Sequence, residues 1–189
     1  MRGPVRWPRR TMLGVLLVPP AWGLAGCSPE HDWREIRPDE GGFMVTLPAK
    51  PAKLTRPIHL ESLKLDMTMH GAQVREVAYT VGTAVLPSAD DAARDRALAS
   101  MQAAMVRNIT GTVRASRPVA ITRVDPAGQR IGTAPGVEIE AIGTMRGREA
   151  LLIARFVGLG AQAWQAVALG EHVDREHAAL FLESLKLVR

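Results

Sequence analysis

A single cysteine, Cys27, is the residue of this 189-residue chain best suited to covalent chemistry. It follows Leu24, Ala25 and Gly26, a branched apolar residue and two small ones, which leave the backbone open to a peptidase while the thiol supplies a nucleophile. Residues 1–22 have the composition of an export signal, with four arginines and no acid before an apolar run. Cleavage before Cys27 and modification of its thiol are therefore predicted.

The segment from Leu24 to Cys27 resembles the lipobox of bacterial lipoproteins. The resemblance implies that the signal peptide is cut between Gly26 and Cys27, and that Cys27 receives a diacylglycerol that anchors the chain to a membrane. The apolar run before it is interrupted by Pro19 and Pro20 and is shorter than the roughly 20 residues that span a bilayer, so a membrane helix is not expected. The alternative is a lone buried cysteine after an ordinary signal peptide.

Arg9 and Arg10 open the run Arg9-Arg10-Thr11-Met12-Leu13, which resembles a twin-arginine export motif with Met12 where phenylalanine is commoner. This motif implies export of a domain that has already folded. Two adjacent arginines also occur in ordinary basic signal regions, so both export routes remain open.

His172, Glu176 and His177 are the residues whose types suit a metal ion best. His172 and Glu176 are one helical turn apart, whereas His177 is rotated by about 100° from Glu176 around a helix. A solvated start of a helix accounts for the same three residues. We therefore expect no metal site and keep these side chains as weak candidates.

Motifs of known enzyme classes do not occur in the sequence. It has no Gly-x-Ser-x-Gly elbow, no phosphate-binding Walker loop and no His-Glu-x-x-His pair. Gly158-Leu159-Gly160 lacks the third glycine of a dinucleotide loop and precedes a strand pattern, which favours a hairpin turn. We predict a protein that is not an enzyme and has no cofactor; a metal-dependent or other hydrolase using the histidines is a less favoured alternative.

The charge of the chain changes once the signal peptide is set aside. Removing its four arginines from the 24 basic residues leaves 20, against 19 acidic residues, so the mature chain carries about one net positive charge. Nucleic-acid binding would call for a basic face with interleaved aromatic residues. We therefore expect no nucleic-acid partner.

The elements that must position these residues are mostly strands. Residues 60–70 form the clearest strand pattern, because apolar and polar residues alternate strictly from Ser62 to His70. Residues 71–73 predict a turn into a second strand over 74–86, and the proline-bounded stretch 48–57 predicts a loop. Further strands are predicted over 43–47, 113–124, 136–145, 149–157, 163–169 and 186–188, with turns at 125–128, 146–148 and 158–162.

Two helices interrupt the strands. The first is predicted from a cap at Ser88 through Asn108, and the second over residues 173–184. Four methionines suit either an adaptable binding surface or a core seam between strand and helix, and we expect the core seam. These are Met67, Met69, Met101 and Met105.

The order of these features resembles PsbP-like domains, including small bacterial lipoproteins of the DcrB and LpqN type. Gly42–Pro51 (GFMVTLPAKP) resembles their opening strand and loop, Tyr79–Pro87 before a long helix resembles their middle, and Phe181–Leu187 (FLESLKL) resembles their closing segment, with Leu185 where phenylalanine is usual. The resemblance implies an α+β fold: an antiparallel β-sheet of about six to eight strands packed against two main helices, as a PsbP-like α/β sandwich. It brings no common catalytic residue, and the better-understood members act by docking onto protein partners.

The predicted organisation has three parts. Residues 1–26 form the removed signal peptide, residues 27–32 the lipidated cysteine and a short tether, and residues 33–189 a single α+β domain. Ser28 follows the cysteine where aspartate would retain a lipoprotein in the inner membrane. In a Gram-negative host we therefore expect the periplasmic face of the outer membrane.

The expected function is that of a membrane-anchored envelope lipoprotein whose domain is a non-enzymatic, protein-binding or accessory module. Its partners would be the membrane, through the lipid on Cys27, and an envelope protein. The alternative from another class is a carrier or sensor of a small apolar ligand. The sequence leaves the process, the partner and the oligomeric state open.

Overall fold

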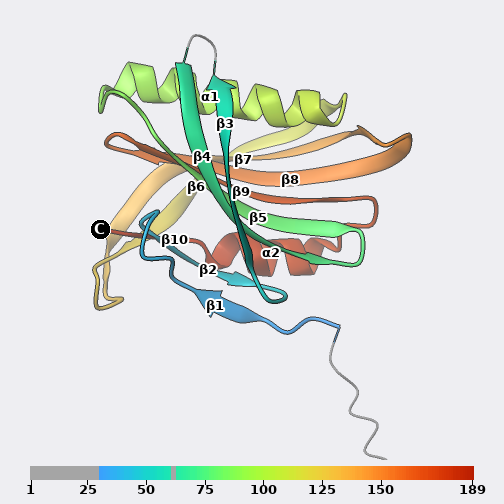
Figure 1. Ribbon diagram of the computed structural model, residues 1–189, viewed down its shortest axis with the longest axis horizontal. Coiled ribbons are helices and arrows are strands. Elements are labelled where there is room, and N and C mark those ends of the chain that lie inside the picture. Colours follow the sequence, from blue (N-terminus) through green and yellow to red (C-terminus); the bar gives the residue numbers. More distant parts are fainter. Residues whose placement is uncertain (1–29, 61–62) are drawn as a thin grey trace, which may run out of the picture.

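Strands dominate the fold because apolar and polar residues alternate along most of the chain. The computed structural model describes residues 30–60 and 63–189, in which ten strands and two helices form (Figure 1). The helices are α1 (Asp91–Asn108) and α2 (Arg175–Ser184). The strands are β1 (Arg34–Ile36), β2 (Phe43–Leu47), β3 (Ala52–Leu60), β4 (Leu63–Val74), β5 (Val77–Val85), β6 (Thr112–Val124), β7 (Arg130–Met145), β8 (Arg148–Leu159), β9 (Gln162–Gly170) and β10 (Lys186–Val188).

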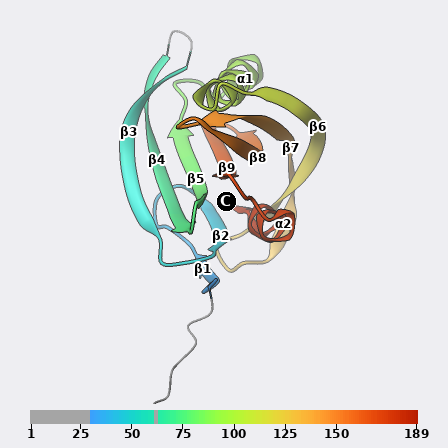
Figure 2. The same cartoon turned by 90° about the vertical axis from the view of Figure 1, so that its right-hand side faces the viewer.

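All ten of these strands belong to one sheet, in the order β1-β2-β10-β6-β7-β8-β9-β5-β4-β3. Neighbouring strands are antiparallel except β10 and β6, which pair in parallel. The chain between β6 and β10 runs through β7, β8, β9 and α2, which gives the long connection that a parallel pair requires. The sheet curls, so that β3 and β6 lie on opposite sides of the molecule in the end-on view (Figure 2).

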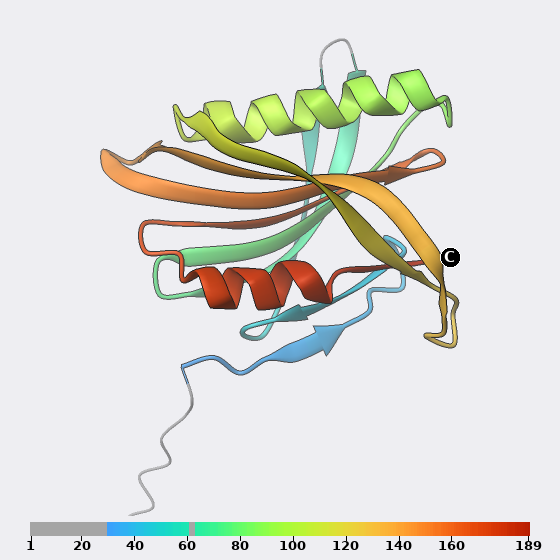
Figure 3. The same cartoon turned by 180° about the vertical axis from the view of Figure 1, so that it is seen from behind.

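The central strands β8 and β9 are covered on both faces, because α1 lies on one side of them and α2 on the other (Figures 1 and 3). Both strands are buried along nearly their whole length, as expected for strands that pass between two layers. Trp164 and Phe181 belong to the apolar cluster on the α2 side, and Phe156 and Met101 to the cluster on the α1 side.

The predicted fold class is wrong. The sheet has ten strands instead of six to eight, it is mixed and curled, and the helices have only 18 and 10 residues, so the sheet is not simply packed on two main helices. The two strands that the sequence did not reveal are β1, which has three residues, and β3. β3 shows no apolar alternation because residues 52–57 are all exposed.

β3 occupies most of the stretch predicted as a loop. It is the last strand of the sheet and pairs with β4 from Ala52 to Leu60. A proline such as Pro57 is compatible with an edge strand, because one side of that strand has no ladder to complete.

The turn between β4 and β5 also differs from its predicted position. Val74 pairs with Val77, so the turn consists of Arg75 and Glu76, and Arg75 has a φ of 49°. Gly71 lies inside β4, where a Cβ atom would come within 2.5 Å of the Thr80 side chain on β5. The glycine allows close approach of two strands and does not form a turn.

The remaining helix predictions are largely confirmed. α1 ends at Asn108 as predicted, but Asp90 caps it instead of Ser88. Met67 and Met101 are buried in one apolar cluster, and Met69 and Met105 pack against that cluster. The four methionines therefore form the predicted core seam.

Candidate functional site

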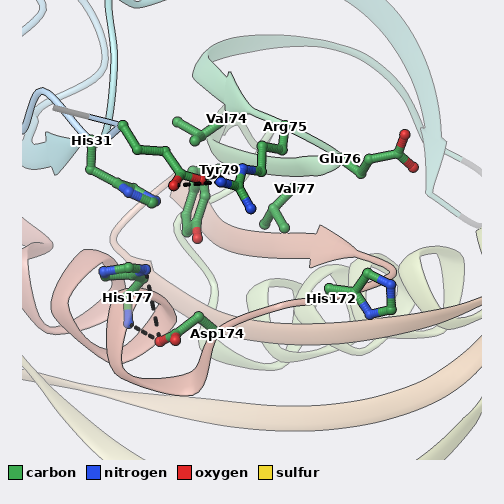
Figure 4. Close-up of a pocket in the computed structure, with 10 residues that line it drawn as sticks. His31, Val74, Arg75, Glu76, Val77, Tyr79, His172, Asp174 and His177 are labelled. Atoms are coloured by element: carbon green, nitrogen blue, oxygen red, sulfur yellow. Dashed lines mark hydrogen bonds and ion pairs between the residues drawn. The ribbon is translucent and has the colours of Figure 1, made fainter. Parts of the chain in front are cut away.

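A cleft of about 340 Å³ opens where the β4–β5 turn, the start of β5 and the start of α2 meet the N-terminal segment (Figure 4). Its size falls at the lower end of the range of about 300–1,000 Å³ that is usual for small-molecule sites. Apolar, acidic and basic side chains all contribute to its wall. They are Glu30, His31, Val74, Arg75, Glu76, Val77, Tyr79, His172, Asp174 and His177.

Asp174 caps the N-terminus of α2, and this role uses half of its carboxylate. Its Oδ1 accepts hydrogen bonds from the backbone amides of His177, at 2.9 Å, and Glu176, at 2.8 Å. The hydrogen bond from the His177 amide is the main reason that the pKa of Asp174 lies below its usual range. No residue in 30–60 or 63–189 hydrogen-bonds to Oδ2. Asp174 thus presents one ionised oxygen to the cleft.

Tyr79 contributes a hydroxyl carried by a buried ring. Its side chain is 1% exposed, and its ring meets those of Phe181 and Trp33 edge-on at centroid distances of 5.5 and 6.3 Å. The hydroxyl points into the cleft and has no hydrogen-bond partner in the described part of the chain (Figure 4). Burial, and then the charge of Asp174, raise the pKa of Tyr79, so the phenol stays protonated at neutral pH. The hydroxyl is open to the cleft, where a ligand can take the place of solvent as its hydrogen-bond partner.

The N-terminal segment forms the third wall of the cleft. Arg75 donates to both carboxylate oxygens of Glu30, with an Nη2–Oε2 distance of 2.8 Å. The His31 ring lies 4.1 Å from that of His177 and stacks on Trp33 at 5.7 Å. These contacts hold the start of the described chain against α2 and the β4–β5 turn.

The candidate metal ligands are only partly brought together. His172 and His177 both line the cleft, but they lie on opposite sides of it (Figure 4), and Glu176 is exposed outside it. Within residues 30–60 and 63–189, no three His, Cys, Asp or Glu side chains are placed to hold one metal ion.

Sequence reasoning found two of the cleft histidines but missed Tyr79 and Asp174, whose oxygens face the cleft. Tyr79 fits the two-residue apolar period of the strand predicted over residues 74–86, so the pattern gives it no functional role. It is the single tyrosine of the chain, and a hydroxyl on an apolar face signals a needed partner. Asp174 directly precedes a helix pattern, which is the signal for an N-cap.

The remaining predicted site residues lie outside the described part of the chain. These are Cys27 with its cleavage partner Gly26, and the export candidates Arg9 and Arg10. Within the described ranges, neither helix has the length and apolar character needed to cross a bilayer.

Comparisons with known proteins give little beyond this geometry. No protein-family profile and no curated protein sequence matches the chain. One similar solved structure is a crystal structure of a protein of unknown function from Pseudomonas aeruginosa. It is 13% identical, the match covers 65% of this chain and 87% of that chain, and the TM-score is 0.36.

Proposed function

We propose that this protein is a lipid-anchored, non-enzymatic binding module of the cell envelope, whose cleft beside the start of α2 holds a small amphipathic ligand. In a host with two membranes it is placed on the periplasmic face of the outer membrane. The anchor is supported by the sequence around Cys27, and the ligand by the cleft. Val74 and Val77 give the cleft an apolar wall, and Tyr79 and Asp174 give it polar atoms.

The observation that carries the ligand is the Tyr79 hydroxyl. Because the Tyr79 ring is packed in the core, the hydroxyl is held in place at the cleft, and a ligand can hydrogen-bond to it without ordering a flexible side chain. The hydroxyl faces a cleft, so a ligand can reach it from solvent.

Native mass spectrometry of the protein purified from its own host tests this function. We expect a noncovalent small molecule on the wild type and its loss in Tyr79→Phe, which removes one oxygen atom and keeps the ring packed. The control is Thr55→Val, which removes an exposed hydroxyl on β3. An empty wild-type protein in every preparation would contradict the proposal.

The anchor has a separate test. Replacing Cys27 by serine should move the protein from the membrane fraction to the soluble fraction and abolish the mass added by the lipid. If the wild type carries no lipid, the envelope placement by anchoring is wrong, although the cleft is unaffected.

The second candidate function is binding of a protein partner, which is the function that the sequence favours. Large apolar side chains that are exposed lie on five different elements, whereas the cleft gathers apolar and polar groups in one place. These side chains are Leu54, Val85, Val113, Ile131 and Leu180. Crosslinking in intact envelopes that captures one stoichiometric protein, independently of Tyr79, would put this candidate first.

A further inference from the structure

The residues that line the cleft carry more negative than positive charges. With histidines counted as neutral, the lining residues carry three carboxylates and one guanidinium. Arg75 is occupied by Glu30, and Glu76 pairs with Arg148 at 3.1 Å, outside the cleft lining. Asp174 has no Arg or Lys within salt-bridge distance among residues 30–60 and 63–189, and its nearest ionisable partner is His177 at 3.8 Å. The unbalanced charge in the cleft is therefore negative.

Asp174 Oδ2 and Tyr79 Oη both face the cleft and can accept hydrogen bonds from a ligand. Asp174 Oδ2 is ionised and can only accept, and a phenol oxygen accepts as readily as it donates. Asp174 is half exposed and accepts two backbone N–H groups at the N-terminus of α2, so it stays ionised without a ligand. A cationic ligand gains a charge–charge attraction to it that a neutral ligand lacks, and an anionic ligand would be repelled. A cation that carries N–H donors satisfies both oxygens.

The walls of the cleft fit the remainder of such a ligand. The ring of Tyr79 borders the cleft, and tyrosine is one of the aromatic residues that attract cations. Val74 and Val77 form an apolar wall next to it. A short alkyl chain attached to an ammonium group combines both requirements.

We propose that the cleft binds a primary alkylamine, whose ammonium group donates to Asp174 Oδ2 and Tyr79 Oη while its alkyl chain packs against Val74 and Val77. This inference rests on the proposed ligand-binding function and names the chemical class of the ligand. A free alkylamine and the headgroup of an ethanolamine phospholipid share this chemistry.

Calorimetry on the mature chain, residues 27–189 with Cys27→Ser, tests the class with four six-carbon probes: hexylamine, hexanol, hexanoate and hexyltrimethylammonium. We expect hexylamine to bind most tightly, because only its ammonium group combines positive charge with N–H donors. Asp174→Asn keeps a good helix cap but removes the charge, and it should weaken hexylamine binding by at least about tenfold, the loss expected for a hydrogen bond to a charged group. Asp90→Asn makes the same change at the cap of α1 and should leave binding unchanged.

Two further experiments distinguish a free amine from a lipid headgroup, and failure of the amine proposal from failure of the ligand-binding function. If cosedimentation with phosphatidylcholine vesicles requires both added phosphatidylethanolamine and Asp174, the ligand is the lipid headgroup. If hexylamine binds but this cosedimentation does not occur, the ligand is a free amine. Equal binding of hexanol or hexanoate, or no effect of Asp174→Asn, overturns the amine. If a small molecule still copurifies from the host in a Tyr79-dependent way, the binding function stands, and if none does, both proposals fall.

Discussion

At the scale of single residues, Glu138 on β7 binds two arginines on neighbouring strands. Its Oε1 accepts from Arg117 on β6 at 2.6 Å, and its Oε2 accepts from Arg155 on β8 at 2.6 Å. Arg155 is only 8% exposed and also donates to the Leu182 carbonyl of α2 at 2.9 Å. One carboxylate thus joins three strands and, through Arg155, the second helix.

Glu138→Gln should destabilise the protein strongly. The change leaves the buried Arg155 without its counter-charge, which costs about 3–5 kcal/mol when a buried ion pair is broken. The matched control is Glu140→Gln, two residues along β7, whose partner Arg175 is 64% exposed, so its loss should be much smaller. Urea denaturation measures both free energies of unfolding, and equal losses would contradict a buried role for Arg155.

His70 should make stability depend on pH. Its Nδ1 is buried without a hydrogen bond in the described chain, and its ring meets Phe43 edge-on at 5.8 Å. Burial, and then the charge of Lys53, lower the pKa of His70 from its ordinary 6.5, against an opposing effect of Glu40. The unfolded chain therefore binds this proton first, so stability falls as the pH drops below about 6.5 toward the lower folded value.

His70→Leu removes this titration, so it should flatten part of the decline between pH 7 and pH 5 in thermal unfolding scans. His59→Leu changes an exposed histidine on β3 and should preserve the decline. Identical pH profiles for the wild type and His70→Leu would show that burial does not shift this histidine.

At the scale of elements, alternation predicted most of the strands, and what it missed has definite physical reasons. β3 is a strand because β4 supplies its hydrogen bonds. Most of its residues are exposed, so its sequence shows no alternation of apolar and polar residues. Glycine suits both a turn and a close contact between strands, and the sequence alone does not distinguish these two roles for Gly71. The same limit hid the cleft, since Tyr79 and Asp174 meet only through the pairing of β5 with β9 and the start of α2.

β3 also carries residues that protect a sheet edge against association. Lys53 and Pro57 lie on it, and a charged residue and a missing N–H both oppose pairing with another strand. The double change Lys53→Thr and Pro57→Thr should therefore produce concentration-dependent self-association in sedimentation velocity. Arg107→Gln removes one exposed charge on α1 without touching an edge and should leave the protein as it was. A double variant that sediments like the wild type would contradict this protective role.

At the scale of the whole molecule, the predicted lipid anchor on Cys27 would lie close to the cleft. Cys27 precedes Glu30 by three residues, a reach of at most about 10 Å, and Glu30 is held at the cleft by Arg75. A lipid on Cys27 would therefore place the cleft next to the membrane surface. α1 lies at the opposite end of the molecule from β1, so it would face away from the lipid (Figures 1 and 2).

This orientation predicts unequal access from solvent when the lipidated protein is reconstituted into vesicles. A cysteine at His172, beside the cleft, should react several-fold more slowly with a bulky maleimide than in the unlipidated Cys27→Ser chain. A cysteine at Ala103, exposed on α1, should react at the same rate in both forms. The lipidated Cys27 has no free thiol, so each variant reports one position. Slowing at Ala103 instead of His172 would reverse the orientation, and a cleft that faces away from the membrane would have to take its ligand from solution and not from the lipid surface.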